Sequence, residues 1–276
     1  MQKLGNVGVP SAILETVGMT REFRGFVAVN SVDLCVQEGT IHALIGPNGA
    51  GKTTCFNLLT KFLAPTRGTI RFKGHDITGQ KPADVARLGL VRSFQISAVF
   101  PHLSAMENVR LALQRARGGS FDFWRPESLL HGYDSRARAL LADVGLEGYE
   151  EEQAALLSYG RKRALEIATT LALEPTMLLL DEPTAGMTHE DVDRIVALIR
   201  RIRERGVTCL LIEHDMRLVM TLSEYITVLD YGTKIAEGLP HVVRSDAKVM
   251  EAYLGRGAAA GEYGKQEAGT GGGASA

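Results

Sequence analysis

The sequence predicts an α/β fold in which parallel strands alternate with helices. Two short apolar runs, 177–180 and 207–212, have the length and composition of buried strands. Residues 190–204 lie between them and repeat apolar side chains at helical spacing, so that one face of the expected helix carries Val192, Ile195, Val196, Ile199 and Ile202. Strands that alternate with helices in this way are typical of a parallel sheet.

The first third of the chain is richer in strands. Residues 13–23 and 32–36 have the composition of strands, and a turn with Arg and Gly at 24–25 lies between them. A further strand is expected at 68–72, after a turn that contains Pro and Gly. We therefore expect a β-rich region around the short apolar run at 41–45.

The pattern becomes helical from about Leu103. Ser104 and Glu107 have the spacing of a capping box, in which each side chain bonds the backbone N–H of the other residue. Helical character resumes at 135–144 after a break at Gly118 and Gly119. We therefore expect an insertion of helices in the middle of the chain.

Composition narrows the possible classes of protein. The chain has 276 residues, of which 45% are hydrophobic and 23% charged, as in globular proteins. Its formal net charge of -1 gives no general attraction to nucleic acid or to an anionic membrane. Three scattered cysteines lack the spacing of a zinc site or a disulfide framework, and no apolar run approaches the roughly 18 residues of a membrane span. We expect a soluble chain without a secretion signal.

A glycine-rich segment follows the apolar run at 41–45. The residues Gly46-Pro47-Asn48-Gly49-Ala50-Gly51-Lys52-Thr53 match the pattern GxxxxGK[ST]. In such a loop, glycines let backbone N–H groups converge on phosphate oxygens, Lys52 neutralises the outer phosphates, and Thr53 offers its hydroxyl to Mg²⁺. An ordinary glycine-rich turn is the alternative, but the strand before it and the helix after it favour a nucleotide site. The sequence predicts that the chain binds ATP or GTP through a single such loop.

Two adjacent carboxylates, Asp181 and Glu182, follow the expected strand at 177–180. The end of this strand is expected to place Asp181 near Thr53 and Mg²⁺, and Glu182 where it can polarise a water for attack on the γ-phosphate. A strand that merely ends in a charged turn is the alternative for this segment alone. Beside the glycine-rich loop, the two carboxylates predict hydrolysis of the nucleotide.

Several segments together resemble the ATP-binding subunits of ABC transporters, over about residues 12–255. A helix that starts at Ser158, ahead of the strand that ends at Asp181, is characteristic of this family and absent from kinases and GTPases. The resemblance depends on the order of five segments: Gly46 to Thr54, Gln95, Leu157-Ser158-Tyr159-Gly160-Arg161, Asp181-Glu182-Pro183-Thr184 and Glu213-His214-Asp215.

The resemblance implies a P-loop NTPase fold with an ABC ATPase core, that is, a parallel sheet plus an antiparallel β-subdomain, and an inserted α-helical subdomain. The ATP-binding core would comprise residues 12–95 and 158–255. The helical subdomain would comprise residues 96–157, and residues 256–276, which are rich in Gly and Ala, would form a disordered tail.

The resemblance also implies a role for each matching residue. Glu182 would be the general base, His214 would contact the γ-phosphate, and Gln95 would touch Mg²⁺ and sense the membrane subunit. Asp181 would support Mg²⁺ together with Thr53. ATP would be held by Phe23, Gly46, Pro47, Asn48, Gly49, Ala50, Gly51, Lys52, Thr53 and Thr54, and by Ser158 and Gly160 of the opposite subunit. For Phe23, whose ring would stack on adenine, a core position in a strand is the alternative.

Two segments depart from the general family pattern. In the signature LSGGQ, Tyr159 replaces a glycine and Arg161 replaces the glutamine. The cations at 161–163 oppose the dipole of the helix that they open unless an anion faces them, and a solvated basic turn is the alternative. Thr188 replaces an aspartate that normally helps to couple the two sites of a dimer. These departures resemble the LivG-type branch, which energises the uptake of branched-chain amino acids and includes similar chains for amides, urea and aromatic acids.

The function implied is that of the ATPase of an importer at the cytoplasmic face of the cell membrane. Two such subunits, identical or paralogous, would close around two ATP and drive two integral-membrane permeases, which an external solute-binding protein supplies. Exposed aromatic residues on a soluble protein usually mark a docking surface, so Phe100 and Leu103, which follow Gln95, are expected to dock on a permease, with a second aromatic cluster at Phe121, Phe123 and Trp124 as the weaker candidate. Burial of these aromatic residues in the small core of the insertion is the alternative. An ATPase for lipid or lipopolysaccharide export or extraction is one alternative. A non-transport ABC ATPase acting on DNA or ribosomes is another, although no nucleic-acid partner is expected.

Overall fold

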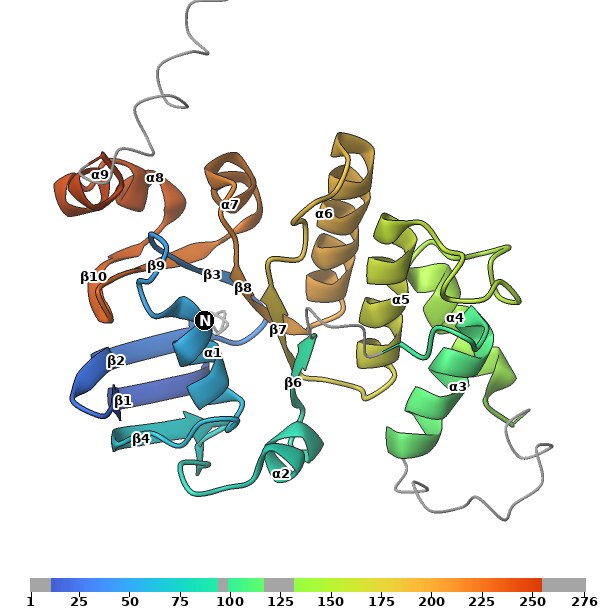
Figure 1. The fold of residues 1–276 in the computed structure, drawn as a ribbon, viewed down its shortest axis with the longest axis horizontal. Coiled ribbons are helices and arrows are strands. Elements are labelled where there is room, and N and C mark those ends of the chain that lie inside the picture. The colour runs from blue at the N-terminus through green and yellow to red at the C-terminus, as the bar shows by residue number, and fades with distance from the viewer. Residues whose placement is uncertain (1–10, 94–98, 117–131, 255–276) are drawn as a thin grey trace, which may run out of the picture.

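Two sheets form the framework of the protein, whose computed structural model describes residues 11–93, 99–116 and 132–254 (Figure 1). The strands of the first sheet are β1 (Ala12–Phe23), β2 (Phe26–Gln37), β4 (Arg67–Phe72) and β5 (His75–Asp76). The strands of the second sheet are β3 (Ile41–Ile45), β6 (Leu90–Ser93), β7 (Met177–Asp181), β8 (Thr208–Ile212), β9 (Tyr225–Asp230) and β10 (Thr233–Gly238). The first sheet is antiparallel and has the order β2-β1-β4-β5, and the second has the order β10-β9-β3-β8-β7-β6.

The second sheet is parallel except at β10, which pairs antiparallel with β9. All five residues of β3, β7 and β8 are buried, as expected for strands that are covered on both faces. The predicted α/β fold with a parallel sheet and an antiparallel β-region is therefore confirmed. Because β3 ends at Ile45 and β7 at Asp181, the parallel arrangement brings the glycine-rich loop and the carboxylates to the same edge of the sheet.

Helices cover the parallel sheet, and its two faces belong to two apolar clusters. The helices are α1 (Lys52–Leu59), α2 (Pro82–Arg87), α3 (Ala105–Ala116), α4 (Asp134–Asp143), α5 (Tyr159–Leu171), α6 (His189–Glu204), α7 (Met216–Leu222), α8 (Pro240–Arg244) and α9 (Ala247–Leu254). Along β7, Leu178 and Leu180 enter the cluster formed with α3 to α7, whereas Leu179 enters the cluster formed with α1 and the antiparallel sheet. This alternation follows from the two-residue period of a strand.

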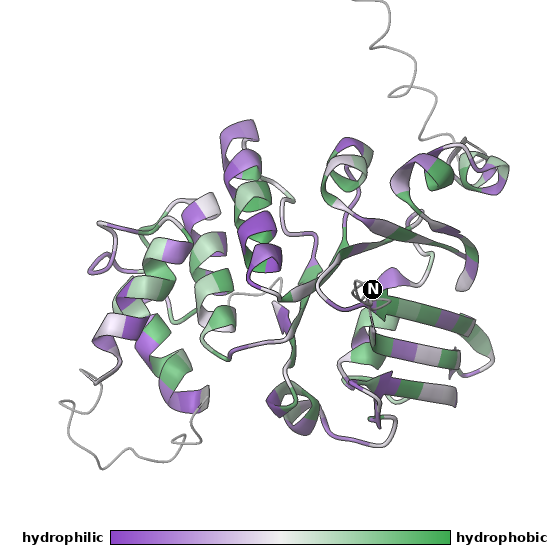
Figure 2. Ribbon diagram, turned by 180° about the vertical axis from the view of Figure 1, so that it is seen from behind, coloured by the Kyte–Doolittle hydropathy of each residue, from purple (hydrophilic) through white to green (hydrophobic). Residues whose placement is uncertain are grey.

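Two expected helical features are present. The backbone N–H of Ser104 donates to Glu107 Oε2 at 2.7 Å, and the N–H of Glu107 donates to Ser104 Oγ at 3.2 Å, so the capping box opens α3 as predicted. Helix α6 has one apolar and one polar face (Figure 2), and Ile195, Ile199 and Ile202 of the predicted face are buried. None of the helices in the described parts of the chain has the length and apolar character needed to span a bilayer.

The N-terminal hairpin differs from the sequence expectation in its length. Strand β2 begins at Phe26, which pairs with Phe23 across a two-residue turn, whereas the pattern predicted a strand only from residue 32. The polar pair Asn30 and Ser31 interrupts the apolar alternation inside this strand, and Ser31 has a left-handed backbone with φ of 50°. The pairing with β1 extends β2 across this irregular point.

Candidate active site

The glycine-rich loop connects β3 to α1. Strand β3 lies between β8 and β9 in the sheet, so the start of the loop is fixed by neighbours on both sides. A Cβ on Gly46 would lie 2.1 Å from the carbonyl oxygen of Leu229, and a Cβ on Gly51 would lie 2.6 Å from that of Ala28. Both glycines also have positive φ angles, of 149° and 97°. The tight path of the loop therefore requires glycine at these two positions.

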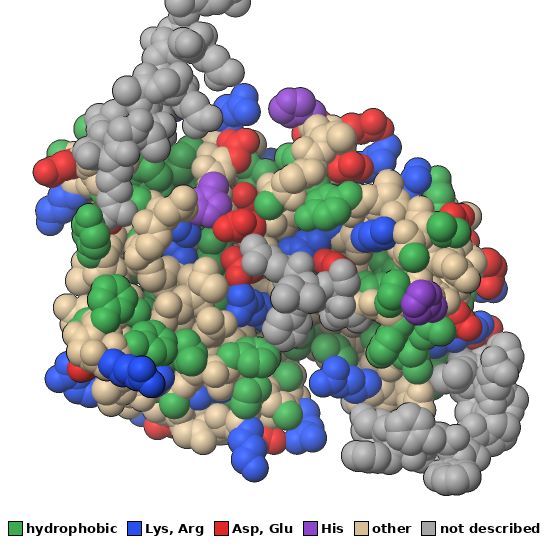
Figure 3. All heavy atoms as spheres, viewed as in Figure 1, with side chains coloured by type: hydrophobic (Ala, Val, Ile, Leu, Met, Phe, Trp, Pro, Cys, Tyr) green, Lys and Arg blue, Asp and Glu red, His purple; other side chains and the backbone are tan. Residues whose placement is uncertain are grey.

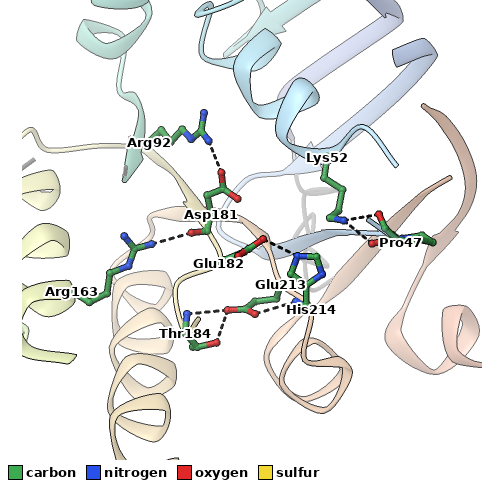
Figure 4. A network of polar contacts seen from close by, with 10 residues as sticks. Pro47, Lys52, Arg92, Arg163, Asp181, Glu182, Thr184, Glu213 and His214 are labelled. Atoms are coloured by element: carbon green, nitrogen blue, oxygen red, sulfur yellow. Dashed lines mark hydrogen bonds and ion pairs between the residues drawn. The ribbon is translucent and has the colours of Figure 1, made fainter. Parts of the chain in front are cut away.

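Lys52 is the first residue of α1, and its side chain turns back into the loop (Figure 4). Its Nζ donates to the carbonyl oxygens of Gly46 at 2.7 Å and of Pro47 at 2.9 Å. The pKa of Lys52 lies below its usual value, because the effect of burial exceeds the opposite effect of the nearby carboxylates of Glu182 and Asp181. The lysine thus provides a cation inside the loop, close to both acidic residues.

The rest of the predicted phosphate loop surrounds this cation. Ala50 is buried, whereas Asn48, Gly49 and Thr53 are exposed and Thr54 is half-buried. Thr53 and Thr54 occupy the first turn of α1, where backbone N–H groups have no partner within the helix. Such a turn favours an anion, so the loop and the helix start suit phosphate groups.

Asp181 and Glu182 lie at the carboxyl end of β7, next to the end of β8. Glu182 has a left-handed backbone with φ of 46°, and its N–H donates to the carbonyl oxygen of Ile212 at 2.9 Å. This conformation is uncommon for a residue other than glycine and turns the chain sharply after Asp181. His214 follows β8, and its Nε2 lies 2.7 Å from Glu182 Oε1. The structure therefore brings these two predicted site residues into direct contact.

A third carboxylate, that of Glu213, holds the two loops together. It is buried, with 4% of its surface exposed. Its Oε1 accepts hydrogen bonds from the N–H of Thr184 at 3.1 Å and from the hydroxyl of the same residue at 2.6 Å. Its Oε2 accepts from the N–H of His214 at 3.1 Å. Glu213 thereby fixes the loop after β7 relative to His214, a position for which the sequence analysis assigned no role.

Two arginines contact Asp181, and only one of them was considered from the sequence. Arg92 on β6 forms an ion pair with the carboxylate of Asp181. Arg163 on α5 donates to the backbone carbonyl of Asp181 at 3.1 Å and to Glu166 Oε2 at 2.7 Å. The alternative of a solvated basic turn at residues 161–163 is therefore excluded for Arg163, because its guanidinium is buried and bonded within the protein. A charged residue in the short apolar strand β6 was the signal that could have identified Arg92.

The segment at the start of α5 contains Ser158, Tyr159 and Gly160. Ser158 is the N-cap residue, is exposed, and makes no capping bond with its side chain. A Cβ on Gly160 would lie 2.5 Å from the carboxylate of Asp191 on α6, so a larger residue here would displace that side chain. At this helix start, the Arg161 guanidinium lies 4.0 Å from the centre of the Tyr149 ring.

Thr188, which stands where an aspartate is usual, begins α6. Its hydroxyl accepts from the N–H of Asp191 at 3.3 Å and donates to Asp191 Oδ2 at 3.1 Å. Through Asp191, this threonine is connected to Gly160. The departure from the general pattern therefore has a defined structural role as a helix cap.

The remaining predicted residues lie at the edge of the site or outside the described part of the chain. Phe23 ends β1 with 39% of its surface exposed, and the Arg21 guanidinium lies 4.5 Å from its ring centre, so it is not a core residue. Gln95 falls outside the described residues, as do Phe121, Phe123 and Trp124 and the predicted tail 256–276.

In the space-filling view, acidic, basic and histidine side chains gather near the middle of one face (Figure 3).

The donor set suits a divalent cation that arrives with phosphates. Within the described residues, no group of three or more His, Cys, Asp or Glu side chains could hold a metal by itself. The candidate ligands are the hydroxyl of Thr53 and the carboxylate of Asp181, both hard oxygen donors. Mg²⁺ is commonly bound by one or two protein oxygens together with substrate phosphates and waters. The residues present therefore fit Mg²⁺ in company with a nucleotide.

Comparison with known proteins agrees with this site. Residues 29–185 match the family described as ABC transporter, and residues 233–259 match a family described as branched-chain amino acid ATP-binding cassette transporter. The chain is 42% identical over 252 residues to the high-affinity branched-chain amino acid transport ATP-binding protein BraF of Pseudomonas aeruginosa. The aligned region covers 88% of this chain and 98% of BraF. The chain is 40% identical, with the same coverage, to LivG of Escherichia coli, which carries the same description.

Solved structures show the same fold. The ADP conformation of MJ1267, an ATP-binding cassette of an ABC transporter, superposes with a TM-score of 0.78 at 30% identity and covers 88% of this chain and 99% of that one. A nucleotide-free ATP-binding cassette from an ABC transporter gives a TM-score of 0.77 at 29% identity, over 88% of this chain and 98% of that one. Together with the sequence relatives, these likenesses show that the chain belongs to the ABC transporter ATP-binding family, in the branch of BraF and LivG.

Proposed function

We propose that this chain hydrolyses ATP to power the uptake of branched-chain amino acids through a membrane complex. The observation that carries the proposal is the contact between Glu182 and His214, at the edge of the sheet where Lys52 and Asp181 also lie. The names of BraF and LivG, which describe branched-chain amino acid transport, supply the solute class.

Each residue of this site would contribute one part of the reaction. Lys52 and the backbone N–H groups of the loop would hold the β- and γ-phosphates. Thr53 and Asp181 would hold Mg²⁺, which would neutralise charge on the phosphates. Glu182 accepts a proton from the attacking water, and His214 orients the Glu182 carboxylate while it contacts the γ-phosphate. Gln95 would join the metal site and Phe23 would stack on adenine, both in keeping with the family pattern.

The assembly that we propose is a dimer of this chain with itself or with a paralogue, docked on two permeases at the cytoplasmic face of the membrane. A periplasmic or extracellular solute-binding protein would deliver the solute to the permeases. Ser158 and Gly160 would cap the γ-phosphate of ATP bound to the opposite subunit, and the exposure of Ser158 supports this role. We also propose the division into a core of 12–95 and 158–255 and a helical subdomain of 96–157. The packing of α3 against α4 supports a helical unit, and α5, with which the second core segment begins, packs against both of these helices.

The first experiment measures ATP hydrolysis and dimer formation. Purified protein is expected to hydrolyse ATP in the presence of Mg²⁺, and Glu182→Gln is expected to bind ATP, lose turnover and accumulate as a dimer on size-exclusion chromatography. Glu190→Gln, which changes an exposed carboxylate on α6, is the matched control. If Glu182→Gln stays monomeric with ATP, alone and with its paralogue, the proposed dimer mechanism is wrong.

The second experiment tests the exchange of residues between subunits. Cross-linked dimers of one Lys52→Ala subunit and one Ser158→Ala subunit contain one intact composite site and one site with both defects. They are expected to hydrolyse ATP faster than either parent dimer. Equal inactivity of the mixed and parent dimers would argue that both sites must act together or that Ser158 does not act across the interface. Nucleotide binding by the mixed dimers separates these two outcomes, since only the intact site would retain tight binding.

The third experiment tests the solute. Membrane vesicles that contain this chain with its two permeases and binding protein are expected to take up labelled leucine, isoleucine or valine when ATP is supplied inside. The Glu182→Gln variant is the control for ATP dependence. Uptake of amides, urea or aromatic acids in place of these amino acids would place the chain with another solute class of the same branch.

A further inference from the structure

The carboxylate of Asp181 is paired with an arginine side chain of the protein itself. Its Oδ2 accepts a hydrogen bond from a terminal nitrogen of Arg92, and the two side chains are 2% and 10% exposed. Because the pair is removed from water, its attraction is screened only weakly by solvent and salt. The carboxylate that is proposed to support Mg²⁺ is therefore already neutralised by the protein itself.

Arg92 is held in this place independently of Asp181. The other terminal nitrogen of its guanidinium donates to Asn57 Oδ1 at 2.6 Å, and the guanidinium lies 5.7 Å from the centre of the Phe56 ring. Asn57 and Phe56 belong to α1, the helix that Lys52 begins. Arg92 also sits on β6, which pairs with β7 so that Arg92 lies opposite Leu179. The cation is thus fixed between the helix of the phosphate loop and the strand of Asp181, and Figure 4 shows its contact with Asp181.

We propose that Arg92 competes with the divalent cation for the carboxylate of Asp181, and so weakens metal binding at the nucleotide-loaded site. The proposal rests on the function proposed above, which assigns Mg²⁺ to Asp181. A carboxylate that is neutralised by an arginine attracts a second cation less strongly, and the two cations repel one another. Arg92 therefore lowers the affinity of the nucleotide-loaded site for the metal.

A purely structural role for Arg92 predicts the opposite effect. If Arg92 only held Asp181 in the correct rotamer, removing the guanidinium would loosen a metal ligand and weaken metal binding. If Arg92 competes for the carboxylate, removing its charge strengthens metal binding. The sign of the change in metal affinity therefore decides between the two roles.

The test measures the binding of Mn²⁺, a paramagnetic substitute for Mg²⁺, to protein loaded with an equal amount of ADP. Free Mn²⁺ is followed by electron paramagnetic resonance, so the readout does not depend on turnover. Arg92→Gln is expected to bind Mn²⁺ about tenfold more tightly than the wild type, which corresponds to about 1.4 kcal/mol. Arg92→Lys keeps a charge but loses the planar fork, and it is expected to fall between the two.

Controls separate the site from general effects of an arginine change. Arg110→Gln removes a guanidinium that pairs with Asp134, and its Mn²⁺ affinity is expected to equal that of the wild type. In an Asp181→Asn background, Arg92→Gln is expected to leave the Mn²⁺ affinity unchanged, since the shared carboxylate is gone. A second titration without ADP is expected to detect no Mn²⁺ binding to either protein, since the two protein oxygens of Thr53 and Asp181 are too few to hold the metal without phosphates.

Each outcome bears on a distinct claim. Weaker or unchanged Mn²⁺ binding by folded Arg92→Gln would overturn the competition and leave the proposed function intact. If Arg92→Gln does not fold, because Asp181 is left as an unpaired buried charge, Arg92→Lys decides by the direction of its shift. Wild-type protein that binds neither ADP nor Mn²⁺ with ADP would instead overturn the proposed function.

Discussion

The imidazole Nε2 of His214 lies 2.7 Å from Oε1 of Glu182, so the segment that follows β8 contacts the residue that follows β7. The backbone of Glu182 is left-handed, with φ of 46°. Its carboxylate is thus held by a constrained backbone on one side and by the histidine on the other. Such a side chain can keep one orientation towards a reacting water.

Replacement of this histidine tests the value of that orientation. His214→Ala is expected to lower kcat by about 10²-fold, as removal of a positioned acid–base partner commonly does, while the KM for ATP changes little. Steady-state hydrolysis measures both quantities. His241→Ala, which removes an exposed histidine on α8, is the control. A kcat close to that of the wild type would mean that Glu182 keeps its orientation without the imidazole.

The bridging carboxylate of Glu213 makes a second prediction. In Glu213→Gln, the side-chain amide N–H₂ would face either the N–H of His214 or that of Thr184, so one hydrogen bond is lost. The loss is expected to destabilise the protein by about 1–3 kcal/mol, as for a buried N–H group without a partner. We also expect kcat to fall more than KM changes, because His214 moves. Urea unfolding and steady-state kinetics measure the two effects, and a stability loss with normal kcat would limit Glu213 to a structural role.

Acid should destabilise the protein through His42 on β3. The imidazole is 1% exposed, its Nε2 lies 2.9 Å from Thr227 Oγ1, and burial lowers its pKa from 6.5 to about 3. Between these two pH values the unfolded chain binds a proton that the folded chain does not, so stability falls as pH falls. The expected loss from pH 7 to pH 5 is about 2 kcal/mol.

A variant without the titrating group isolates this contribution. His42→Gln keeps a polar nitrogen near Thr227 but cannot bind the proton. Its free energy of unfolding, from urea titrations at pH 7, 6 and 5, is expected to depend less steeply on pH than that of the wild type. Equal slopes for the two proteins would show that His42 is protonated as readily in the folded chain as in the unfolded one.

Phe100 provides a prediction about the membrane partner. Its ring is 58% exposed, while its backbone N–H and carbonyl bond the side chain of Asn108 at 2.7 and 3.1 Å. An exposed aromatic ring on a fixed backbone is typical of a docking surface. Phe100→Ala is expected to leave basal hydrolysis within about threefold, and to reduce uptake and co-purification with the permeases.

Matched variants support this test. Phe62→Ala removes another exposed phenylalanine, 52% exposed, and is expected to behave as the wild type. Leu103→Asp places a charge beside Phe100 and is expected to impair uptake in the same way. Full uptake by both Phe100→Ala and Leu103→Asp in membrane vesicles would remove this surface from the docking site.

The sequence predicted those parts of the site that depend on local patterns. The loop from Gly46 to Thr53 is visible because its glycines and its lysine are adjacent in the chain, and β7 is visible because its apolar run ends in two carboxylates. The capping box of Ser104 and Glu107 spans a single helical turn. In each case, the interacting residues are close enough in sequence for their spacing to reveal the structure.

Residues whose partners lie far along the chain were missed. Arg92 binds Asp181 across 89 residues, and Glu213 binds Thr184 across 29. For Gly160, the sequence predicted a role for its backbone N–H, whereas the structure adds the close approach of Asp191 from another helix. Such pairings are set by the order of strands in the sheet and the packing of helices, which local spacing does not encode.

The position of β3 in the middle of its sheet has a consequence for how the protein is made. Its neighbours β8 and β9 lie far downstream, and β9 ends at Asp230. A growing chain on the ribosome therefore displays β3 with two unpaired edges until most of the coding sequence has been translated. Chains that terminate before Thr208 are left with these edges permanently, which makes them clients for chaperones and proteases rather than reduced versions of the ATPase.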